Sequence, residues 1–323
     1  MADTYSTRGA HAGSRANPPY VQCPYVQCLG AATLDTVLRV PAIPPHGKVL
    51  AEACAVFGAG MASAAAASIA RLGGRAGIWA RIGDDDAGTR WRADLEGEGV
   101  DVSAVRIVPG RRTAISTIVV DAAGERLIVP FYDPEMPRDP SWLPLDTVGR
   151  AGAVLVDTRW PDGAAAALDA ARAAGVPAIL DADVADPAVL HDLAARADHV
   201  VCSEPGLALL EPSGDPAALA ARLPRARVVA VTLGAEGVRW IVDGTAGHQP
   251  GFAVAAVDTL SAGDVFHGAY ALAVAEGRAV AEAMRFAAAA AAIKVTRFGG
   301  RLGAPTRDEV EATLAAAAPA AAD

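Results

Sequence analysis

Short apolar segments alternate with longer segments of helical pattern along most of the chain, and this alternation limits the possible folds more than any other feature. Most of the apolar segments end in a polar residue or a glycine, and the clearest are residues 76–81, 153–157, 178–181, 199–202 and 228–232. The helical segments include 61–72, 163–174 and 216–222. The pattern predicts a three-layer, doubly wound α/β fold with a mostly parallel sheet covered by helices on both faces.

Two extended segments interrupt this alternation. Residues 35–57 and 113–131 lack helical periodicity, and residues 121–124 have the composition of a hairpin turn. They predict a small β-sheet lid beside the α/β core, formed by about 36–57 and 111–135. Because exposed sheet edges and faces tend to pair, the lid also predicts a homodimer formed through it.

The two ends of the chain differ from the rest in composition. Residues 1–24 are rich in Ser, Gly, Arg and Pro and are expected to form a disordered tail. This tail contains Pro19–Cys23, which the chain repeats as Pro24–Cys28, and only the second copy runs into an apolar strand. Residues 25–316 are expected to form a single domain, followed by an alanine-rich tail at 317–323.

The charge and cysteine content exclude several classes of partner. The formal net charge is −9 and no block of lysines or arginines occurs, so neither nucleic acid nor a membrane is expected as a partner. The four cysteines form no C-x-x-C pair, and no apolar run reaches membrane-spanning length. These features predict reduced thiols and a cytoplasmic location.

The segment 257–269 carries the clearest chemical signal. Small residues lead into a helix expected to begin near Ala262 or Gly263, and the free N–H groups of a helix start suit a phosphate. Gly263 lets the backbone approach a ligand, and Asp264 places a carboxylate beside the same anion site. This arrangement suits phosphoryl transfer. The alternative is that Asp264 is only a favourable acid in a first helical turn.

Three other enzyme classes find little support in the sequence. No G-x-x-x-x-G-K-[ST] segment occurs, which excludes a P-loop kinase. Asp264 and His267 could share a helix face, but no G-x-S-x-G segment accompanies them. A dinucleotide-dependent oxidoreductase would depend on Gly58-x-Gly60 alone, because Ser63 stands where the third glycine is needed.

Four segments in order resemble motifs of the ribokinase-like (PfkB) carbohydrate kinases. Asp258-Thr259-x-x-Ala262-Gly263-Asp264 is similar to their D-T-x-G-A-G-D signature. The other three are Gly58-Ala59-Gly60 with its following helix, Arg81 to Gly88, and Val231 to Gly237. The resemblance implies ATP-dependent phosphorylation of a sugar hydroxyl, that of a ketose or a keto-sugar acid, with Mg²⁺, and K⁺ is a further candidate cofactor. A nucleoside kinase of the same fold and a non-catalytic sugar- or nucleotide-binding relative remain as alternatives.

The same resemblance assigns roles to individual residues. Asp264 would be the catalytic base, and the N–H groups of Ala262, Gly263 and Asp264 would form an anion hole. Asp35, placed just after the first strand, would hold sugar hydroxyls, and Gly60 would bring backbone against the sugar. The residues expected to border the nucleotide are Thr232, Gly234, Gly237, Ser261 and Gly263.

Two positions depart from the family pattern. Ser261 replaces a glycine, which requires its backbone to avoid angles reserved for glycine. The N-x-x-E element tied to magnesium appears as Ser203-Glu204-Pro205-Gly206. Glu204 is therefore the candidate metal ligand, acting through water.

Several stretches are most similar to bacterial sulfofructose kinases, among them 157–163, 203–208 and 264–269. By this similarity Lys48, at the start of the second lid strand, and Arg159 would surround an anionic end of the substrate, such as the sulfonate of 6-deoxy-6-sulfofructose. Pro130 stands where those enzymes have an asparagine and cannot supply its amide donors.

Overall fold

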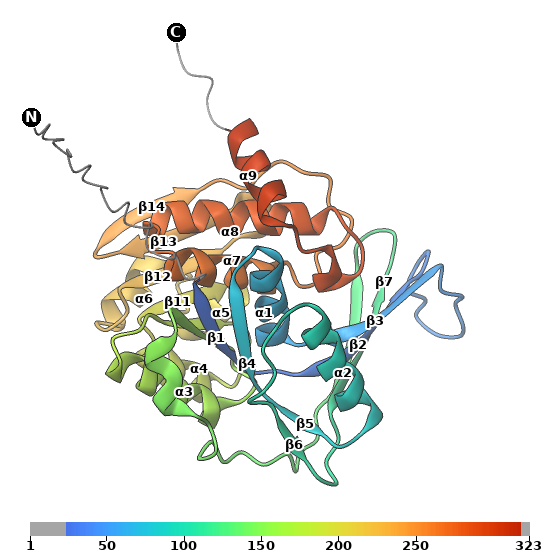
Figure 1. Ribbon diagram of the computed structural model, residues 1–323. Coiled ribbons are helices and arrows are strands. Elements are labelled where there is room, and N and C mark those ends of the chain that lie inside the picture. Colours follow the sequence, from blue (N-terminus) through green and yellow to red (C-terminus); the bar gives the residue numbers. More distant parts are fainter. Residues whose placement is uncertain (1–23, 318–323) are drawn as a thin grey trace, which may run out of the picture.

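The computed structural model describes residues 24–317, and a twisted sheet between two helical layers organises it (Figure 1). The eight strands of this sheet lie in the order β14 (Thr245–Gln249), β13 (Val238–Val242), β12 (Val228–Thr232), β11 (His199–Ser203), β10 (Ala178–Ala182), β9 (Ala153–Val156), β1 (Tyr25–Leu29) and β4 (Arg75–Trp79). All pairs from β12 to β4 are parallel, and β13 and β14 are antiparallel. The predicted three-layer fold is confirmed.

Helices cover both faces of this sheet. One core holds buried residues of α1 (Met61–Arg71), α2 (Asp86–Gly97), α7 (Ala262–Ala275), α8 (Val280–Val295) and α9 (Arg307–Ala316). The other core holds residues of α3 (Pro161–Ala173), α4 (Pro187–Arg196), α5 (Glu204–Leu210) and α6 (Pro216–Arg222). In β1, Val26 and Cys28 point into the first core and Leu29 into the second, so this strand is apolar on both faces.

The predicted lid is a four-stranded sheet that projects from the core (Figure 1). Its strands lie in the order β3 (Ala53–Ala59), β2 (Thr33–Arg39), β7 (Ala114–Val120) and β8 (Arg126–Phe131). Val37, Phe57 and Ile118 form a small core on its inner side, whereas every residue of β8 is exposed. A two-stranded sheet of β5 (Arg81–Gly83) and β6 (Arg106–Val108) lies nearby, and three short 3₁₀ helices are η1 (Leu145–Arg150), η2 (Gly234–Glu236) and η3 (Gly300–Gly303).

Two expected positions within the lid were wrong. Asp35 does not follow the first strand but lies inside β2. Strand β1 ends at Leu29, and the chain enters the lid after Gly30. The φ of Gly30 is 153°, and a Cβ atom there would lie 2.2 Å from the Asp157 carboxylate. Lys48 does not begin a strand, because β3 starts at Ala53. Prolines at 41, 44 and 45 remove backbone donors from the connection that carries Lys48.

The proposed tails fall almost entirely outside the described residues, which begin at Pro24 and end at Ala317. The first copy of the duplicated segment, Pro19–Cys23, therefore also lies outside them. Between these limits no helix has the length and apolarity required to cross a membrane.

Candidate active site

Two adjoining hollows lie where the strands of the parallel sheet end beneath the lid. The first has a volume of about 370 Å³ and is lined by the lid and by the turn that leads into α7. The second, of about 530 Å³, lies between α7, α8 and the segment 251–256. They share Thr232, Thr259 and Ala262, so one ligand could contact both. In open parallel sheets, ligands bind at this end of the strands.

The turn before α7 places Asp264 at the edge of the first hollow. The helix begins at Ala262, as the sequence predicted, and Ser261 is its N-cap. The backbone of Ser261 has φ 59° and ψ 14°, a left-handed conformation that is not reserved for glycine. This conformation is open to residues with a side chain at a cost of about 1–2 kcal/mol.

The amides of this turn are available to different degrees. The amide of Ala262 donates to the carbonyl of Thr259 at 3.3 Å. Those of Gly263 and Asp264 have no acceptor among residues 24–317, as is usual in a first helical turn. A Cβ atom at Gly263 would contact nothing within 4 Å, so space for a ligand lies beside it.

The environment of Asp264 favours a carboxyl group that gains and loses protons near neutral pH. Burial raises the pKa of Asp264 to about 7, and the neighbouring Asp181 carboxyl acts in the same direction. Such a group can accept a proton at neutral pH more readily than an ordinary aspartate.

Two further acids come from the end of β10 and were not singled out by the sequence. The side chain of Asp181 lies close to α7, and burial raises the pKa of Asp181 well above the ordinary value. Asp183 accepts a hydrogen bond from Ser203 at 2.8 Å and also lines the first hollow. Their signal in the sequence was their place at the end of a predicted parallel strand.

His267 is buried and fully engaged, which favours its packed role over a hydrolase-like pair with Asp264. Its Nδ1 lies 2.8 Å from the carbonyl oxygen of Gly263, and its Nε2 lies 3.2 Å from that of Val201. Burial lowers the pKa of His267, so the ring is neutral near pH 7.

The residues assigned to the sugar line the opposite wall of the first hollow. Asp35 is buried, accepts a hydrogen bond from Thr33 at 2.8 Å, and has its pKa raised to about 6 by burial. Gly60 has φ 107°, and a Cβ atom there would lie 2.3 Å from the carbonyl oxygen of Ala31. Only glycine fits at this position without a backbone shift.

The lid supplies residues that the sequence did not reveal. Arg126 and Tyr132 reach the first hollow from β8 and the residue that follows it. Pro130 lies opposite Ser116 in the lid and also lines this hollow. The pairing register of β7 and β8 decides which of these side chains face inward, and composition alone does not fix it.

A cationic hollow of about 410 Å³ adjoins the first one and shares Ala31, Tyr132 and Arg159 with it. Four arginines and two aspartates line it: Arg81, Arg112, Arg138, Arg159, Asp133 and Asp186. Lys48 is exposed in the β2–β3 connection and lines neither hollow, so the structure does not bring it to Arg159.

The second hollow contains the residues expected around the nucleotide. Thr232, Gly234 and Gly237 border it, and its walls are largely apolar, with Phe252, Phe266 and several alanines. A Cβ atom at Gly237 would lie 2.0 Å from the carbonyl oxygen of Gln249, and φ is 93° there. An apolar slot of this kind suits a planar ring.

Glu204 does not reach the cavity. It is the exposed first residue of α5, whereas its neighbour Ser203 lines the first hollow. In the described part of the chain no group of three or more His, Cys, Asp or Glu side chains could hold a metal ion. The carboxyl groups that do line the first hollow are those of Asp35, Asp181, Asp183 and Asp264.

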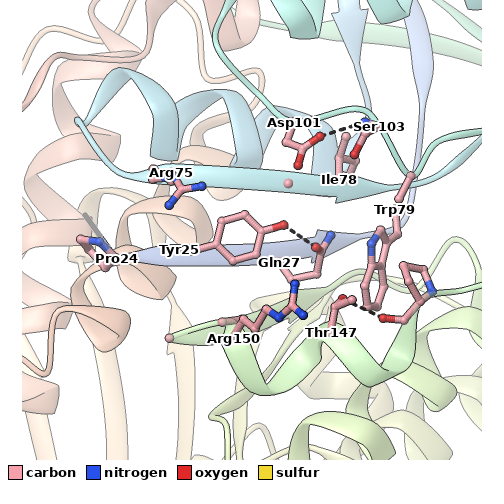
Figure 2. A pocket seen from close by; sticks show the side chains of 15 residues that line it. Pro24, Tyr25, Gln27, Arg75, Ile78, Trp79, Asp101, Ser103, Thr147 and Arg150 are labelled. Carbon is pink, nitrogen blue, oxygen red and sulfur yellow. Dashed lines mark hydrogen bonds between the residues drawn. The ribbon is translucent and has the colours of Figure 1, made fainter. Parts of the chain in front are cut away.

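A further hollow, of about 810 Å³, lies at the opposite end of β1 (Figure 2). Tyr25 donates to Gln27 along its floor, and Arg75 and Arg150 lie on either side of Tyr25. It is lined by the amino end of β1 and by β4 along its length, and it holds none of the residues around Asp264. We therefore do not assign the reaction to it.

The model of the pfkB family of carbohydrate kinases matches residues 24–307. The chain belongs to this family. Among its relatives is an ATP-dependent ribose-1-phosphate kinase of Halopiger xanaduensis, 33% identical over 289 residues that cover 88% of this chain and 96% of that one. A ribokinase of Bacillus subtilis is 28% identical and covers 88% of this chain and 98% of its own length.

Solved structures of this carbohydrate kinase family agree with the fold. A candidate ribokinase from Agrobacterium tumefaciens superposes with a TM-score of 0.88 at 46% identity, covering 91% of this chain and 98% of its own. An Arabidopsis thaliana ribokinase solved with ribose and ATP gives a TM-score of 0.76 at 27% identity, covering 90% and 98%. The chain is thus a sugar kinase with the ribokinase-like fold.

Proposed function

We propose that this enzyme transfers the γ-phosphoryl group of ATP to a hydroxyl of a sugar that carries an anionic group. The observation that carries the transfer is the position of Asp264, between free helix-start amides and a hollow that also holds Asp35. The intact acid and amides favour catalysis over a non-catalytic binding role.

Asp264 is the proposed base. It takes the proton of the sugar hydroxyl as the oxygen attacks the γ-phosphorus, the bond from that phosphorus to the β–γ bridging oxygen breaks, and ADP leaves. The amides of Gly263 and Asp264 donate to the oxygens of the phosphoryl group in flight, where negative charge must be stabilised. The amide of Ala262 contributes less, because Thr259 already accepts from it.

The two substrates would occupy the two hollows. Asp35 accepts hydrogen bonds from sugar hydroxyls, and the bare backbone at Gly60 lets the sugar ring approach. ATP places its base in the apolar hollow beside Gly234 and Gly237, with its phosphates passing Thr232 and Ser261. Mg²⁺ would supply charge neutralisation on the phosphates, and Asp183 could hold it through water.

The anionic end of the sugar would lie in the cationic hollow. Arg112 has no side-chain ion pair or hydrogen bond within residues 24–317, and the Nε of Arg81 and the hydroxyl of Thr158 are buried without a partner. Unsatisfied buried donors cost free energy, and an oxyanion would satisfy them. Arg159 lines both hollows; it donates to the carbonyl of Val184 at 3.0 Å, and its only ion pair within residues 24–317 is a long one, 3.7 Å from Asp183.

The chemistry of these donors fits a phosphate or a sulfonate. The Halopiger relative is named for ribose 1-phosphate, a phosphorylated sugar. The similarity to sulfofructose kinases points instead to 6-deoxy-6-sulfofructose. Both groups are tetrahedral oxyanions that guanidinium groups bind well, so a comparison of substrates must separate them.

The test compares kcat/KM for ribose 1-phosphate, 6-deoxy-6-sulfofructose, ribose, fructose, 2-keto-3-deoxygluconate and adenosine. We expect an anionic sugar to be preferred over its neutral counterpart by at least about tenfold, the value of one charge-assisted bond. Arg112→Ala and Arg159→Ala should remove that preference. Arg92→Ala, on the exposed side of α2, is the matched control.

Preference for a neutral sugar, unchanged in the Arg112 and Arg159 variants, would refute the anionic substrate and leave the sugar kinase in place. Preference for adenosine would identify a nucleoside kinase.

We also propose that the lid forms a homodimer. Leu127, Val129 and Phe131 of β8 are 50%, 56% and 43% exposed, so a row of apolar side chains faces outward on this strand. Such rows commonly mark contacts between chains. Leu127→Lys with Val129→Lys should halve the mass measured by sedimentation, whereas a monomeric parent chain would contradict the proposal.

A further inference from the structure

A buried ion pair lies behind the turn that leads to Asp264. The side chains of Lys294, on α8, and Asp258 are both 0% exposed. The Nζ of Lys294 lies 3.3 Å from Oδ2 of Asp258 and donates to the carbonyl oxygen of the same residue at 2.5 Å. One ammonium group thus contacts both the carboxylate and the main chain of Asp258.

The Asp258 carboxylate ties together two segments of backbone. Its Oδ1 accepts from the amide of Leu260 at 2.8 Å, within the turn before α7. Its Oδ2 accepts from the amides of Gly299 and Gly300 at 3.0 and 2.9 Å. The position of the turn therefore depends on a carboxylate whose charge is balanced by Lys294.

This pair adjoins the site without lining it. Leu260 and Ser261 line the first hollow, whereas neither Lys294 nor Asp258 does. Asp264 is close enough to raise the pKa of Lys294, although burial is the largest influence and lowers it. The ammonium charge therefore acts on the region where the phosphoryl group would be transferred.

Stability alone gives a poor account of such a pair. Desolvating two charges costs several kcal/mol per ion, and an apolar pair of similar volume is often as stable or more so. A lysine also contributes what an apolar residue cannot, namely a fixed monovalent charge held by oxygen atoms of known position.

We propose that the ammonium of Lys294 is the built-in monovalent cation of this kinase. It fixes the turn that presents the Gly263 and Asp264 amides, and it adds positive charge behind the transferring phosphoryl group. Lys294 is thus a positioning residue, and the enzyme works without added K⁺. The inference depends on kinase activity but not on the anionic sugar.

The test uses Lys294→Ala, which leaves the Asp258 oxygens around a space that a small cation can enter. In a buffer that contains Mg²⁺ and whose only monovalent cation is tetramethylammonium, the activity of the parent enzyme should change less than twofold when K⁺ or NH₄⁺ is added. The variant should lose about 100-fold in kcat, comparable to losing one donor to a developing charge. K⁺ or NH₄⁺ should then restore at least tenfold.

Two matched variants separate positioning from folding. Lys294→Met fills the space and should be inactive at every cation concentration. Arg285→Ala removes another cation of α8, one that donates to the carbonyl of Leu314, and should show no response to cations. Thermal unfolding in each buffer confirms that the assays are made on folded protein.

A second measurement is independent of the sugar. The affinity for a non-hydrolysable ATP analogue, measured by calorimetry, should fall in Lys294→Ala and recover with K⁺ or NH₄⁺. A parent enzyme stimulated severalfold by K⁺ overturns the proposal, and so does a folded Lys294→Ala variant that neither cation restores. Because this affinity is measured without a sugar, its outcome can be interpreted even if every sugar tested is a poor substrate.

Discussion

The Nε2 atom of His267 lies 3.4 Å from Oδ1 of Asp181, so a ring on α7 meets an acid at the end of β10. A neutral ring carries one N–H, and the shorter of its two carbonyl contacts, 2.8 Å from Nδ1 to Gly263 against 3.2 Å from Nε2 to Val201, places that hydrogen on Nδ1 and leaves a lone pair on Nε2. Burial raises the pKa of Asp181 well above its ordinary value and so favours the carboxylic acid, which can donate to that lone pair. Neutral hydrogen bonding, rather than an ion pair, thus joins the first turn of α7 to the sheet.

Asp181→Asn should therefore be tolerated, whereas Asp181→Ala should lose about 1–3 kcal/mol of unfolding free energy by leaving Nε2 unsatisfied. The folded and unfolded states of the parent enzyme also bind different numbers of protons. Because the pKa of Asp181 is higher in the folded state, its contribution to stability falls as pH rises from about 4 through the raised value. Denaturant unfolding from pH 4 to 9 should show this fall in the parent and not in Asp181→Asn.

The raised pKa of Asp264 predicts the pH dependence of turnover. A base must be deprotonated, and burial raises the pKa of Asp264 to about 7. At saturating ATP, kcat/KM for the sugar should rise with pH below about 7 and level off above it. A profile that is flat from pH 5 to 9 would contradict the assignment.

Replacing Asp264 by Asn keeps the shape of the side chain and removes the proton acceptor. We expect kcat to fall by about 100- to 10,000-fold, the usual contribution of a general base. The affinity for ATP should change little, because the amides of Gly263 and residue 264 remain. Near-normal turnover in this variant would assign the base to another group.

Local patterns predicted the α/β core and the start of α7 well. Apolar runs that end in polar residues fixed the strands, and the small residues before Asp264 marked the helix start at Ala262. Each of these signals comes from residues that lie close together in the sequence, and this is the range over which propensity and periodicity carry information.

Contacts between distant segments account for what the sequence could not predict. Arg81 follows β4 and Arg112 precedes β7 in the sequence. Only the folded chain brings both of them to the hollow that Arg159 also lines. Lys294 reaches Asp258 from 36 residues away. Asp35 was misplaced because no local pattern shows that β1 ends at Leu29 and that a new strand, β2, begins at Thr33.

Two glycines beside the substrate hollow should respond differently to alanine. At Gly60 a Cβ atom would meet the main chain of Ala31 at 2.3 Å, and φ is 107°. Moving a side chain would relieve neither the close contact nor the unfavourable φ, because the contact is with the main chain of Ala31 and φ is a property of the backbone. Gly60→Ala should therefore destabilise the fold by about 1–3 kcal/mol or more and raise KM for the sugar, as a displaced Ala31 narrows the hollow.

Gly263→Ala is the matched case, since its Cβ atom meets nothing within 4 Å and its φ is not positive. The variant should unfold at the parent temperature, or slightly above it, because alanine favours a helix over glycine by about 1 kcal/mol. Its methyl group would stand in the space we assign to the phosphoryl group, so kcat should fall while the fold stays intact. The test measures thermal unfolding and steady-state kinetics for both variants. A normal kcat in Gly263→Ala would show that the phosphoryl group does not occupy the space beside Gly263.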